Sequence, residues 1–414
     1  MLSRYAQNAI VLGLLTAIGP FAIDMYLPAM PTIAASLQTT TASAQLTLTA
    51  FFIAFGTCQL IFGPLSDVIG RKPPLYFGLA IFVIGSLGCA LAPTAEWLIA
   101  FRFVEGIGAS AAMVIPRAVV RDLHTGLEAT RLMSLIMLVL SVAPILAPLG
   151  GSALIAPFGW RAVFAAVTII ALLAMAMLAL FLPETRPPES RAPVSARHLL
   201  GGFARLLTDG RFLGLTFIGG LGMSRFFVFL ANSSFVYMNH FGLTPAQYSL
   251  AFAVNAIGFI GASQFAALLG GRFGMPRLIT AAVALHTVFA LILLTVTLLG
   301  ADSLPLLMAL LFCAFAWLGL VVPTVMVLAL EPLGPIAGLA SALGGTLQMV
   351  TGGVMIVIVS QFYDGTATPM VVTIALCAVS GLCVCLATLG RHARARHPLP
   401  TGEAGRFQPT SAPR

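Results

Sequence analysis

The stretch Gly63-Pro-Leu-Ser-Asp-Val-Ile-Gly-Arg-Lys-Pro73 is a short charged turn between two long apolar runs. It holds Lys72, the only lysine of the chain, beside Arg71 and Asp67. Only 8% of the residues are charged, so three charges this close together stand out. Each flanking run is long enough to cross a bilayer. The turn is therefore interpreted as a loop between two membrane spans.

The composition as a whole is that of a membrane protein. Hydrophobic residues make up 59% of the 414 residues, and the mean hydropathy is +1.03. A soluble protein cannot bury so much apolar surface, whereas a bilayer favours it. In lipid the backbone must satisfy its own hydrogen bonds, and these runs do not alternate as barrel strands would. We therefore predict an all-α polytopic membrane protein.

Apolar runs of roughly 20 residues, the length that crosses the hydrocarbon core, recur along the whole chain, and we expect twelve spans. A polar, basic segment with several prolines divides them into six and six. We expect a six-helix bundle over 1–183, a cytoplasmic linker over 184–211, a second bundle over 212–390 and a disordered basic tail over 391–414. The expected spans are 8–27, 43–64, 74–93, 97–119, 131–155, 161–182, 212–238, 248–269, 277–299, 304–330, 337–362 and 367–389.

The basic residues set the expected orientation. Of the 21 lysines and arginines, 18 fall on the side that holds the linker and both termini. Arg161 is the one basic residue on the other side, and two arginines lie inside spans. By the positive-inside rule, we expect a multi-pass protein of a bacterial inner membrane with both termini in the cytoplasm.

The same placement argues against other classes of protein. The net charge of +8 lies in loops beside apolar runs and not on a DNA-binding face, so no nucleic-acid partner is expected. The six cysteines fall inside apolar runs without disulfide or metal spacing. The single lysine, in Gly-Arg-Lys-Pro, leaves no phosphate loop for ATP. An intramembrane enzyme is disfavoured because Asp24 and His286 each stand alone. We expect no metal or cofactor.

Four ionisable side chains lie inside predicted spans, where each is costly unless it pairs or faces a cavity. With a rise of about 1.5 Å per residue, Asp24, Arg102 and Arg225 come to one level, somewhat outside the midplane. One shared cavity explains this coincidence better than three unrelated defects. Glu105 follows Arg102 by three residues, so the two share a helix face and can pair.

Each of these residues has more than one interpretation. Asp24 is the candidate proton carrier, because a carboxylate in a site that alternates between wet and dry changes its affinity for protons. It is otherwise a substrate contact or a structural polar residue. Arg102 and Glu105 form either part of the proton path or a structural ion pair. Arg225 either contacts an electronegative group of the substrate or partners Glu105 or a helix-end carbonyl.

Several motifs resemble one known family. Gly63-x3-Asp67-x2-Gly70-Arg71-Lys72 resembles the signature loop between helices 2 and 3 of the major facilitator superfamily. Asp24-Met-Tyr-Leu-Pro-Ala-Met-Pro31 resembles the first-helix motif of its bicyclomycin/chloramphenicol-resistance branch. The resemblance covers nearly all the transmembrane region and implies two pseudo-symmetric six-helix bundles. Further similar motifs are Arg117-Ala-Val-Val-Arg-Asp122, Ala143-Pro-Ile-Leu-Ala-Pro-Leu-Gly-Gly151, Gly159-Trp-Arg-Ala-Val-Phe164, Leu182-Pro-Glu-Thr185, Phe226-Phe-Val-Phe229 and Ala337-Gly-Leu-Ala-Ser-Ala342.

The resemblance implies roles for the matched residues. A cytoplasmic latch would join Arg71 to Asp122 in the outward-open state and separate in the inward-open state. The helix 4 motif associated with proton transfer usually reads Arg-x-x-Gln-Gly, and here Glu105 replaces the glutamine. The implied sets are a proton-coupling set of Asp24, Arg102 and Glu105; a substrate cavity of Asp24, Tyr26, Arg225, Phe226 and Phe229; a gate of Gly63, Asp67, Gly70, Arg71, Lys72 and Asp122; and a helix 5 antiporter motif of Pro144, Pro148, Gly150 and Gly151.

Together these expectations describe a monomeric, proton-coupled multidrug exporter. Its substrates would be small amphiphilic antibiotics, phenicol- or bicyclomycin-like, moved out of the cytoplasm by alternating access. The alternative is proton-coupled export of a metabolite such as an amino acid or a sugar. The residues alone leave the substrate, the number of protons and the oligomeric state open.

Overall fold

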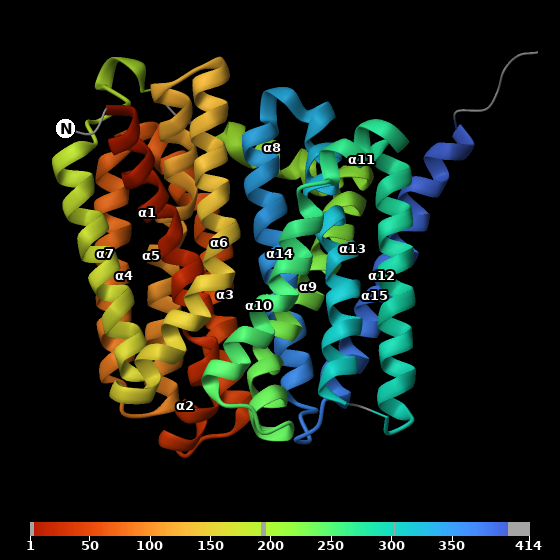
Figure 1. The fold of residues 1–414 in the computed structure, drawn as a ribbon. Helices are drawn as coiled ribbons and strands as arrows, with labels where there is room; N and C mark the ends of the chain where they lie inside the picture. Colours follow the sequence, from red (N-terminus) through yellow and green to blue (C-terminus); the bar gives the residue numbers. More distant parts are fainter. Residues whose placement is uncertain (1–3, 192–195, 302, 396–414) are drawn as a thin grey trace, which may run out of the picture.

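The computed structural model describes residues 4–191, 196–301 and 303–395, and its regular elements are all helical. In this part of the chain, eleven helices are long and apolar enough to cross a membrane, and the bent pair α10 and α11 makes a twelfth (Figure 1). The predicted all-α fold with twelve spans is therefore confirmed. The first half comprises α1 (Arg4–Asp24), η1 (Leu27–Ala29), α2 (Met30–Ser36), α3 (Thr41–Ile69), α4 (Lys72–Leu91), α5 (Ala95–Leu123), α6 (Gly126–Phe158) and α7 (Arg161–Phe181).

The second half repeats this plan after a connecting segment. The connection contains η2 (Pro188–Ser190) and α8 (Ala196–Thr208). The spans that follow include α9, which ends in a π-helical turn, and α10, which is separated from α11 by a bend of 40°. These elements are α9 (Gly210–Phe235), η3 (Val236–His240), α10 (Pro245–Ser263), α11 (Ala266–Phe273), α12 (Met275–Leu298), α13 (Leu304–Leu330), η4 (Glu331–Ile336), α14 (Ala337–Ser360) and α15 (Thr368–Ala395).

The helices gather into two bundles that lie side by side (Figure 1). In the first bundle, α5 packs on α3 and α4, and α1 packs on α6 and α7. In the second, α13 packs on α10 and α12, and α9 packs on α14 and α15. The bundles meet along α3 with α14 and along α6 with α10. The start of α1, the helix α8 and the end of α15 lie at one end, the linker end; the opposite end is the far end.

Local sequence explains where the spans begin and end. Thr40 accepts a hydrogen bond from the backbone of Ser43 and begins α3 at the far end. Gly70 ends α3 in a left-handed conformation with φ of +97°, which other residues rarely adopt. At the start of α10, Thr244 forms a capping box with Gln247.

Two elements differ from the sequence-based expectation. The segment expected as a plain linker contains α8, and Gly202 of this helix packs against Leu339 of α14. The last helix extends to Ala395, beyond the expected end at residue 390. The remainder of the predicted tail lies outside the described residues.

Candidate functional site

An ion pair between two solvent-inaccessible side chains lies inside the first bundle. Arg102 Nη1 is 2.7 Å from Glu105 Oε2, one turn along α5. The same nitrogen donates a hydrogen bond of 3.1 Å to the backbone carbonyl of Ala22. This contact ties α5 to the end of α1, two residues before Asp24.

Aromatic rings complete the surroundings of Arg102. Its guanidinium lies 4.6 Å from the ring centre of Tyr26 and 4.5 Å from that of Phe51. The Tyr26 hydroxyl is 2.6 Å from the hydroxyl of Thr47 on α3. Cation–π contacts of this kind offset part of the cost of burying the charge. Among the described residues, Arg102 Nε and Nη2 and Glu105 Oε1 have no hydrogen-bond partner, so the pair keeps unused donors and an acceptor.

Asp24 is the last residue of α1, and its side chain is only 5% exposed. It lies close enough to Tyr248 of α10, in the second bundle, for the two to interact electrostatically. None of the ion pairs in the described part of the chain involves Asp24, because Arg102 pairs with Glu105 instead. Asp24 is thus a buried carboxylate at the junction between the bundles.

The helix 5 motif lies beside this junction. A side chain at Gly151 of α6 would collide with the backbone carbonyl of Met25, so glycine is what lets α6 approach the turn after Asp24. Gly150, one residue earlier, has more room. The carbonyl of Pro148 accepts a hydrogen bond of 2.9 Å from Ser249 of α10. Pro144 lies one turn earlier, within the same helix.

Arg225 lies apart from the other predicted site residues. Its side chain is fully buried, and its Nη2 lies against Gly381 of α15, where the missing side chain leaves room for the guanidinium. Both α9 and α15 belong to the second bundle, so the structure does not join Arg225 to Arg102 in one cavity. The rise per residue sets the depth of a side chain but not its direction around the helix axis, which is why the expectation of one shared cavity differs from the structure.

The two phenylalanines of the predicted substrate set also pack within the second bundle. Phe229 is fully buried and stacks on Phe252 of α10, with 5.7 Å between the ring centres. Phe226 is partly buried and stacks on Phe259 of the same helix at 5.4 Å. Of the predicted cavity residues, the structure brings Asp24 and Tyr26 near the bundle junction, whereas Phe229 is a core residue.

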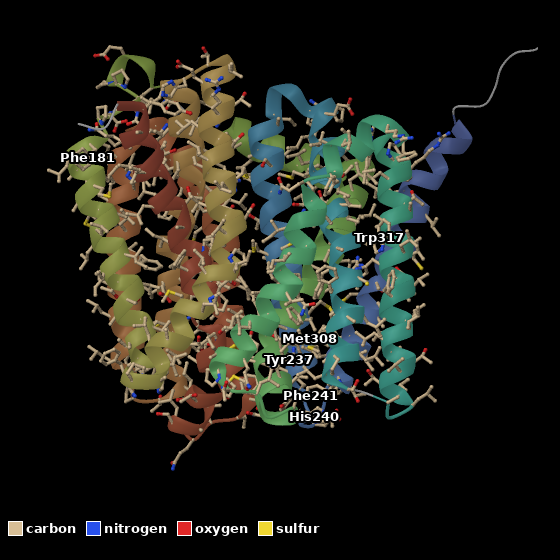
Figure 2. The ribbon with its side chains drawn as sticks, in the orientation of Figure 1. Phe181, Tyr237, His240, Phe241, Met308 and Trp317 are labelled. Carbon is tan, nitrogen blue, oxygen red and sulfur yellow. The ribbon has the colours of Figure 1, made fainter. Side chains whose placement is uncertain are left out.

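Polar and aromatic contacts close the far end between the bundles. Gln45 Nε2 of α3 donates a hydrogen bond of 2.9 Å to Asn232 Oδ1 and one of 3.1 Å to the carbonyl of Ala231, both on α9. Deeper in the same helices, Phe52 and Phe227 stack with ring centres 4.3 Å apart. Tyr237, His240 and Phe241 gather at this end of the second bundle (Figure 2).

Open space lies at the linker end and along the first bundle. A cavity of about 810 Å³ is lined by residues of both bundles. A second, apolar groove of about 770 Å³ runs between α1 and α6. Ile10, Leu14, Ala17 and Phe21 line this groove from α1, and their spacing places Asp24 on the same helix face. The first cavity is lined by Val120, Arg121, Ala129, Thr130, Met133, Ser134, Met137, Leu138, Ser141, Val142, Ile145, Ile260 and Gln264.

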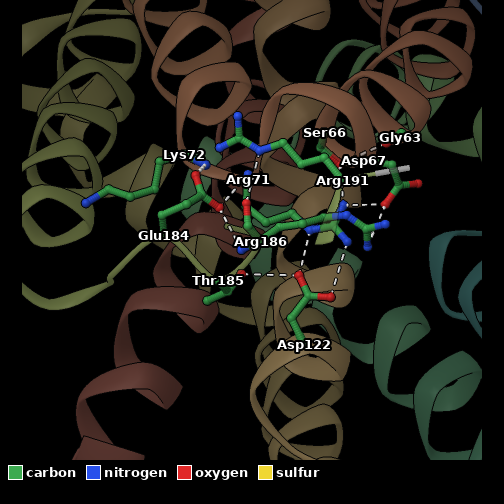
Figure 3. A network of polar contacts seen from close by, with 10 residues as sticks. All are labelled: Gly63, Ser66, Asp67, Arg71, Lys72, Asp122, Glu184, Thr185, Arg186 and Arg191. Atoms are coloured by element: carbon green, nitrogen blue, oxygen red, sulfur yellow. Dashed lines mark hydrogen bonds and ion pairs between the residues drawn. The ribbon is translucent and has the colours of Figure 1, made fainter. Parts of the chain in front are cut away.

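A network of charges surrounds the loop between α3 and α4 (Figure 3). Arg71 Nη1 lies 2.7 Å from Asp67 Oδ1, and Arg71 Nε lies 2.7 Å from Asp122 Oδ2 at the end of α5. Arg71 Nη1 also donates 2.8 Å to the hydroxyl of Ser66. Lys72 takes no part through its side chain, whose ammonium lies 5.8 Å from the ring centre of Tyr76.

The two partners of the expected latch meet in this structure, where Arg71 contacts Asp122 at the linker end. Their separation in an inward-open state stays a prediction. Both residues belong to the first bundle, so a movement of one bundle against the other does not pull them apart. Gly63, the first residue of the motif, lies beside Val114 of α5, where an added methyl group would make an ordinary contact at 3.6 Å.

Glu184 is the member of this network to which sequence reasoning gave no role. Its Oε1 accepts hydrogen bonds from the backbone nitrogens of Arg71 at 2.8 Å and Arg186 at 3.0 Å, and its Oε2 accepts from Lys72 at 3.0 Å. The carboxylate thus caps the start of α4, where backbone N–H groups are otherwise unsatisfied. Thr185 adds a hydrogen bond of 3.2 Å to Asp122. The one sequence feature that singled out Glu184 was its place in the Leu182-Pro-Glu-Thr185 motif.

Hydrogen bonds decide the charge states in this network. Burial alone would raise the pKa of Glu184, but the backbone donors of Arg71, Arg186 and Lys72 outweigh it and hold the pKa below its ordinary value. Burial would lower the pKa of Arg71, but its bonds to Asp122 and Asp67 outweigh it and raise the pKa. Glu184 and Arg71 are therefore both ionised at neutral pH.

Comparison with known proteins agrees with this geometry. Residues 12–357 match the sequence profile of the Major Facilitator Superfamily. The chain belongs to the Major Facilitator Superfamily. Its fold is similar to that of a D-xylose–proton symporter, with a TM-score of 0.72 at 17% identity over 92% of this chain and 97% of the other.

Relatives within the superfamily are similar over most of their length. The uncharacterized MFS-type transporter YdgK of Bacillus subtilis is 36% identical, over 90% of this chain and 93% of its own. A chloramphenicol resistance protein of Pseudomonas aeruginosa is 32% identical, over 89% of this chain and 88% of its own length. A bicyclomycin resistance protein homolog of Haemophilus influenzae is 30% identical, over 89% of this chain and 93% of its own length. With its many apolar helices, this superfamily member is a multi-pass inner-membrane protein.

Proposed function

We propose that this protein exports small amphiphilic antibiotics from the cytoplasm in exchange for protons. The observation that carries the proposal is similarity, over nearly the whole chain, to transporters named for resistance to bicyclomycin and to chloramphenicol. The cavity at the linker end and the groove between α1 and α6, each near 800 Å³, are within the size range of sites for drug-sized ligands. Neither space needs a cofactor or metal for this role.

Charge supports an orientation for this export. The linker end holds nearly all the basic residues outside the spans, and the positive-inside rule places such an end in the cytoplasm. With that orientation, the closed far end faces outward and the cavity at the linker end is open to the cytoplasm. The arrangement fits the step in which a substrate enters, and rocking of the bundles would then open the far end.

Asp24 fits the role of proton carrier. It is buried beside α10 of the opposite bundle, where a rocking motion would change its access to water from one side to the other. A protonated Asp24 would move its proton inward, and its release would accompany the binding of drug. Arg102, which is paired with Glu105 and bonded to the backbone two residues before Asp24, would hold the end of α1 in place.

Efflux from proteoliposomes tests the proposal. The purified protein is reconstituted with an imposed pH gradient, and movement of chloramphenicol, bicyclomycin, an amino acid and a sugar is measured. We expect gradient-dependent transport of at least one antibiotic and none of the metabolites. Transport of the metabolites alone, or antibiotic transport that ignores the pH gradient, would contradict the proposal.

A further inference from the structure

Arg225 is a buried cation that the transport mechanism above does not use. Its Nε donates a hydrogen bond of 2.9 Å to the carbonyl of Leu221 on its own helix. Its Nη1 and Nη2 have no hydrogen-bond partner among the described residues, and its side chain is fully buried. An unpaired charge in such surroundings is costly, so buried charges are normally paired or bound to an ion.

The second bundle offers Arg225 no carboxylate at membrane depth. Between Gly210 and Ala395 the sequence contains three acidic residues: Asp302, Glu331 and Asp364. Asp302 precedes α13 in the sequence, Glu331 begins η4, and Asp364 lies in the loop before α15. The first bundle differs, because its buried Arg102 pairs with Glu105. The charge of Arg225 is therefore not balanced within its own bundle.

A second buried polar group lies near Arg225. His286 of α12 is fully buried. Its neighbour Thr287 donates a hydrogen bond of 3.1 Å to the carbonyl of Ala378 on α15, one turn before the Gly381 that the Arg225 guanidinium meets. His286 Nδ1 lies 2.7 Å from the carbonyl oxygen of Ala314 on α13, and since a carbonyl can only accept, Nδ1 carries a hydrogen. Its Nε2 has no partner among the described residues.

We propose that Arg225 and His286 form a binding site for a small inorganic anion of the chloride class inside the second bundle. An anion at the two Nη groups supplies the missing charge and hydrogen-bond acceptor together. The site is suited to a small ion because it is enclosed by α9, α12, α13 and α15, and because the guanidinium lies directly against Gly381. Neither Arg225 nor His286 lines the cavity at the linker end or the groove between α1 and α6.

Protonation of His286 is linked to this site. Because Nδ1 already donates to Ala314, Nε2 binds an anion only when it carries a hydrogen too, so anion binding takes up a proton. The groups that face this region are Arg225 from α9 and the thiol of Cys377 from α15. The helix α13 contains no Asp, Glu, Lys, Arg or His. Anion binding is therefore expected to strengthen as the pH falls.

Thermal unfolding of the full-length protein in detergent tests the proposal. The midpoint of thermal unfolding is compared between sodium chloride and sodium gluconate of equal ionic strength. Gluconate serves as the reference because it is too large for the site. We expect a saturable rise of at least about 2 °C with chloride, larger at pH 6 than at pH 8. Equal midpoints in the two salts would overturn the proposal.

Variants locate the effect. Arg225→Met is expected to lose the chloride-dependent rise, and His286→Gln to reduce the rise and its pH dependence. Arg272→Gln, at an exposed arginine of α11, controls for general salt effects and is expected to retain the rise. Asp24→Asn is also expected to retain the chloride-dependent rise. Loss of the rise in Asp24→Asn would place the anion in the transport site instead.

Diffraction provides the measurement if Arg225→Met does not fold. Crystals of the wild-type protein soaked in bromide are expected to show an anomalous peak beside the Arg225 guanidinium. Well-ordered crystals without that peak, or a full chloride response in folded Arg225→Met, would overturn the proposal.

Discussion

Arg102 is bonded to the backbone two residues before Asp24, but the two side chains have different surroundings. Arg102 is balanced by Glu105 and lies against two aromatic rings, so its charge is fixed in place. Asp24 is buried without an ion-pair partner among the described residues, so it can gain or lose a proton without breaking a salt bridge. This difference favours Asp24 over Arg102 as the group that carries the proton.

Replacing Asp24 tests that assignment. Asp24→Asn keeps the size and polarity of the side chain but removes its proton chemistry, so we expect a folded protein with no efflux driven by a pH gradient. Proteoliposome efflux measures this, with Glu96→Gln, at a fully exposed residue, as the matched control that keeps normal transport. Normal gradient-driven efflux by Asp24→Asn would exclude the carrier role.

The Arg102–Glu105 pair is open to a second test. Glu105→Leu alone leaves a buried charge unpaired and is expected to cost about 3–5 kcal/mol of stability. The double variant Arg102→Met with Glu105→Leu is expected to regain most of that stability, because no charge is left uncompensated. Thermal unfolding of the three proteins checks both statements. Gradient-driven efflux by the double variant would show that the pair is structural and not part of the proton path.

At this scale the sequence predicted which residues carry charge in the membrane, but not where their side chains point. The spacing of Arg102 and Glu105 indicated their pairing, because one helix turn separates them. The positions of Arg225 and Phe229 could not be predicted, because both depend on how α9 is rotated against its neighbours. Glu184 was missed because its role depends on backbone N–H groups more than a hundred residues away.

At the scale of elements, α6 is positioned by one glycine. The closest approach of α6 to the turn after α1 is at Gly151, against the carbonyl of Met25. We expect Gly151→Ala to lower stability by about 1–3 kcal/mol and to slow efflux, since α6 must move away from α1. Gly150→Ala, where an added methyl group meets little, is the matched control. Equal stability of the two variants in thermal unfolding would contradict this account of α6.

The cap that Glu184 places on α4 predicts a dependence of stability on pH. Because the folded-state pKa of Glu184 is lowered, its contribution is present above the unfolded value of about 4.3 and is lost as the pH falls through the folded value. Glu184→Gln is therefore expected to be less stable than the wild type by about 1 kcal/mol at pH 7. The difference is expected to disappear in acid.

Unfolding midpoints of wild type and Glu184→Gln across that pH range provide the measurement. The control is Glu189→Gln, at an exposed residue of the same segment. A difference that is constant with pH would show that the glutamate acts by packing and not by charge.

Element boundaries were predictable where composition changes sharply. The apolar runs and the glycine at the end of α3 located the spans, since each reflects local chemistry. The helix α8 was not predicted, because its segment is short and basic and packs on α14 only in the folded protein. The bend between α10 and α11 was missed for a similar reason: both pieces belong to one apolar run.

At the scale of the whole molecule, the bundles meet along α3 with α14 and along α6 with α10, and polar contacts join them at the far end. The hydrogen bond between Gln45 and Asn232 must break if the far end opens. Cysteines at these two positions, joined by a thiol crosslinker in a background without the six native cysteines, are expected to stop efflux. Cleavage of the crosslink is expected to restore it. Unimpaired efflux by the crosslinked protein would show that the far end does not open at this point.

The single lysine gives the protein one natural site for labelling with an amine-reactive dye. An amine-reactive dye can attach at Lys72 and, apart from the chain's own terminal amine, nowhere else. The backbone nitrogen of that residue is held by Glu184, and its side chain lies over Tyr76. A fluorophore there would report on the loop between α3 and α4 without any engineered attachment point. Its emission during turnover would follow the charged loop in real time, in the unmodified sequence.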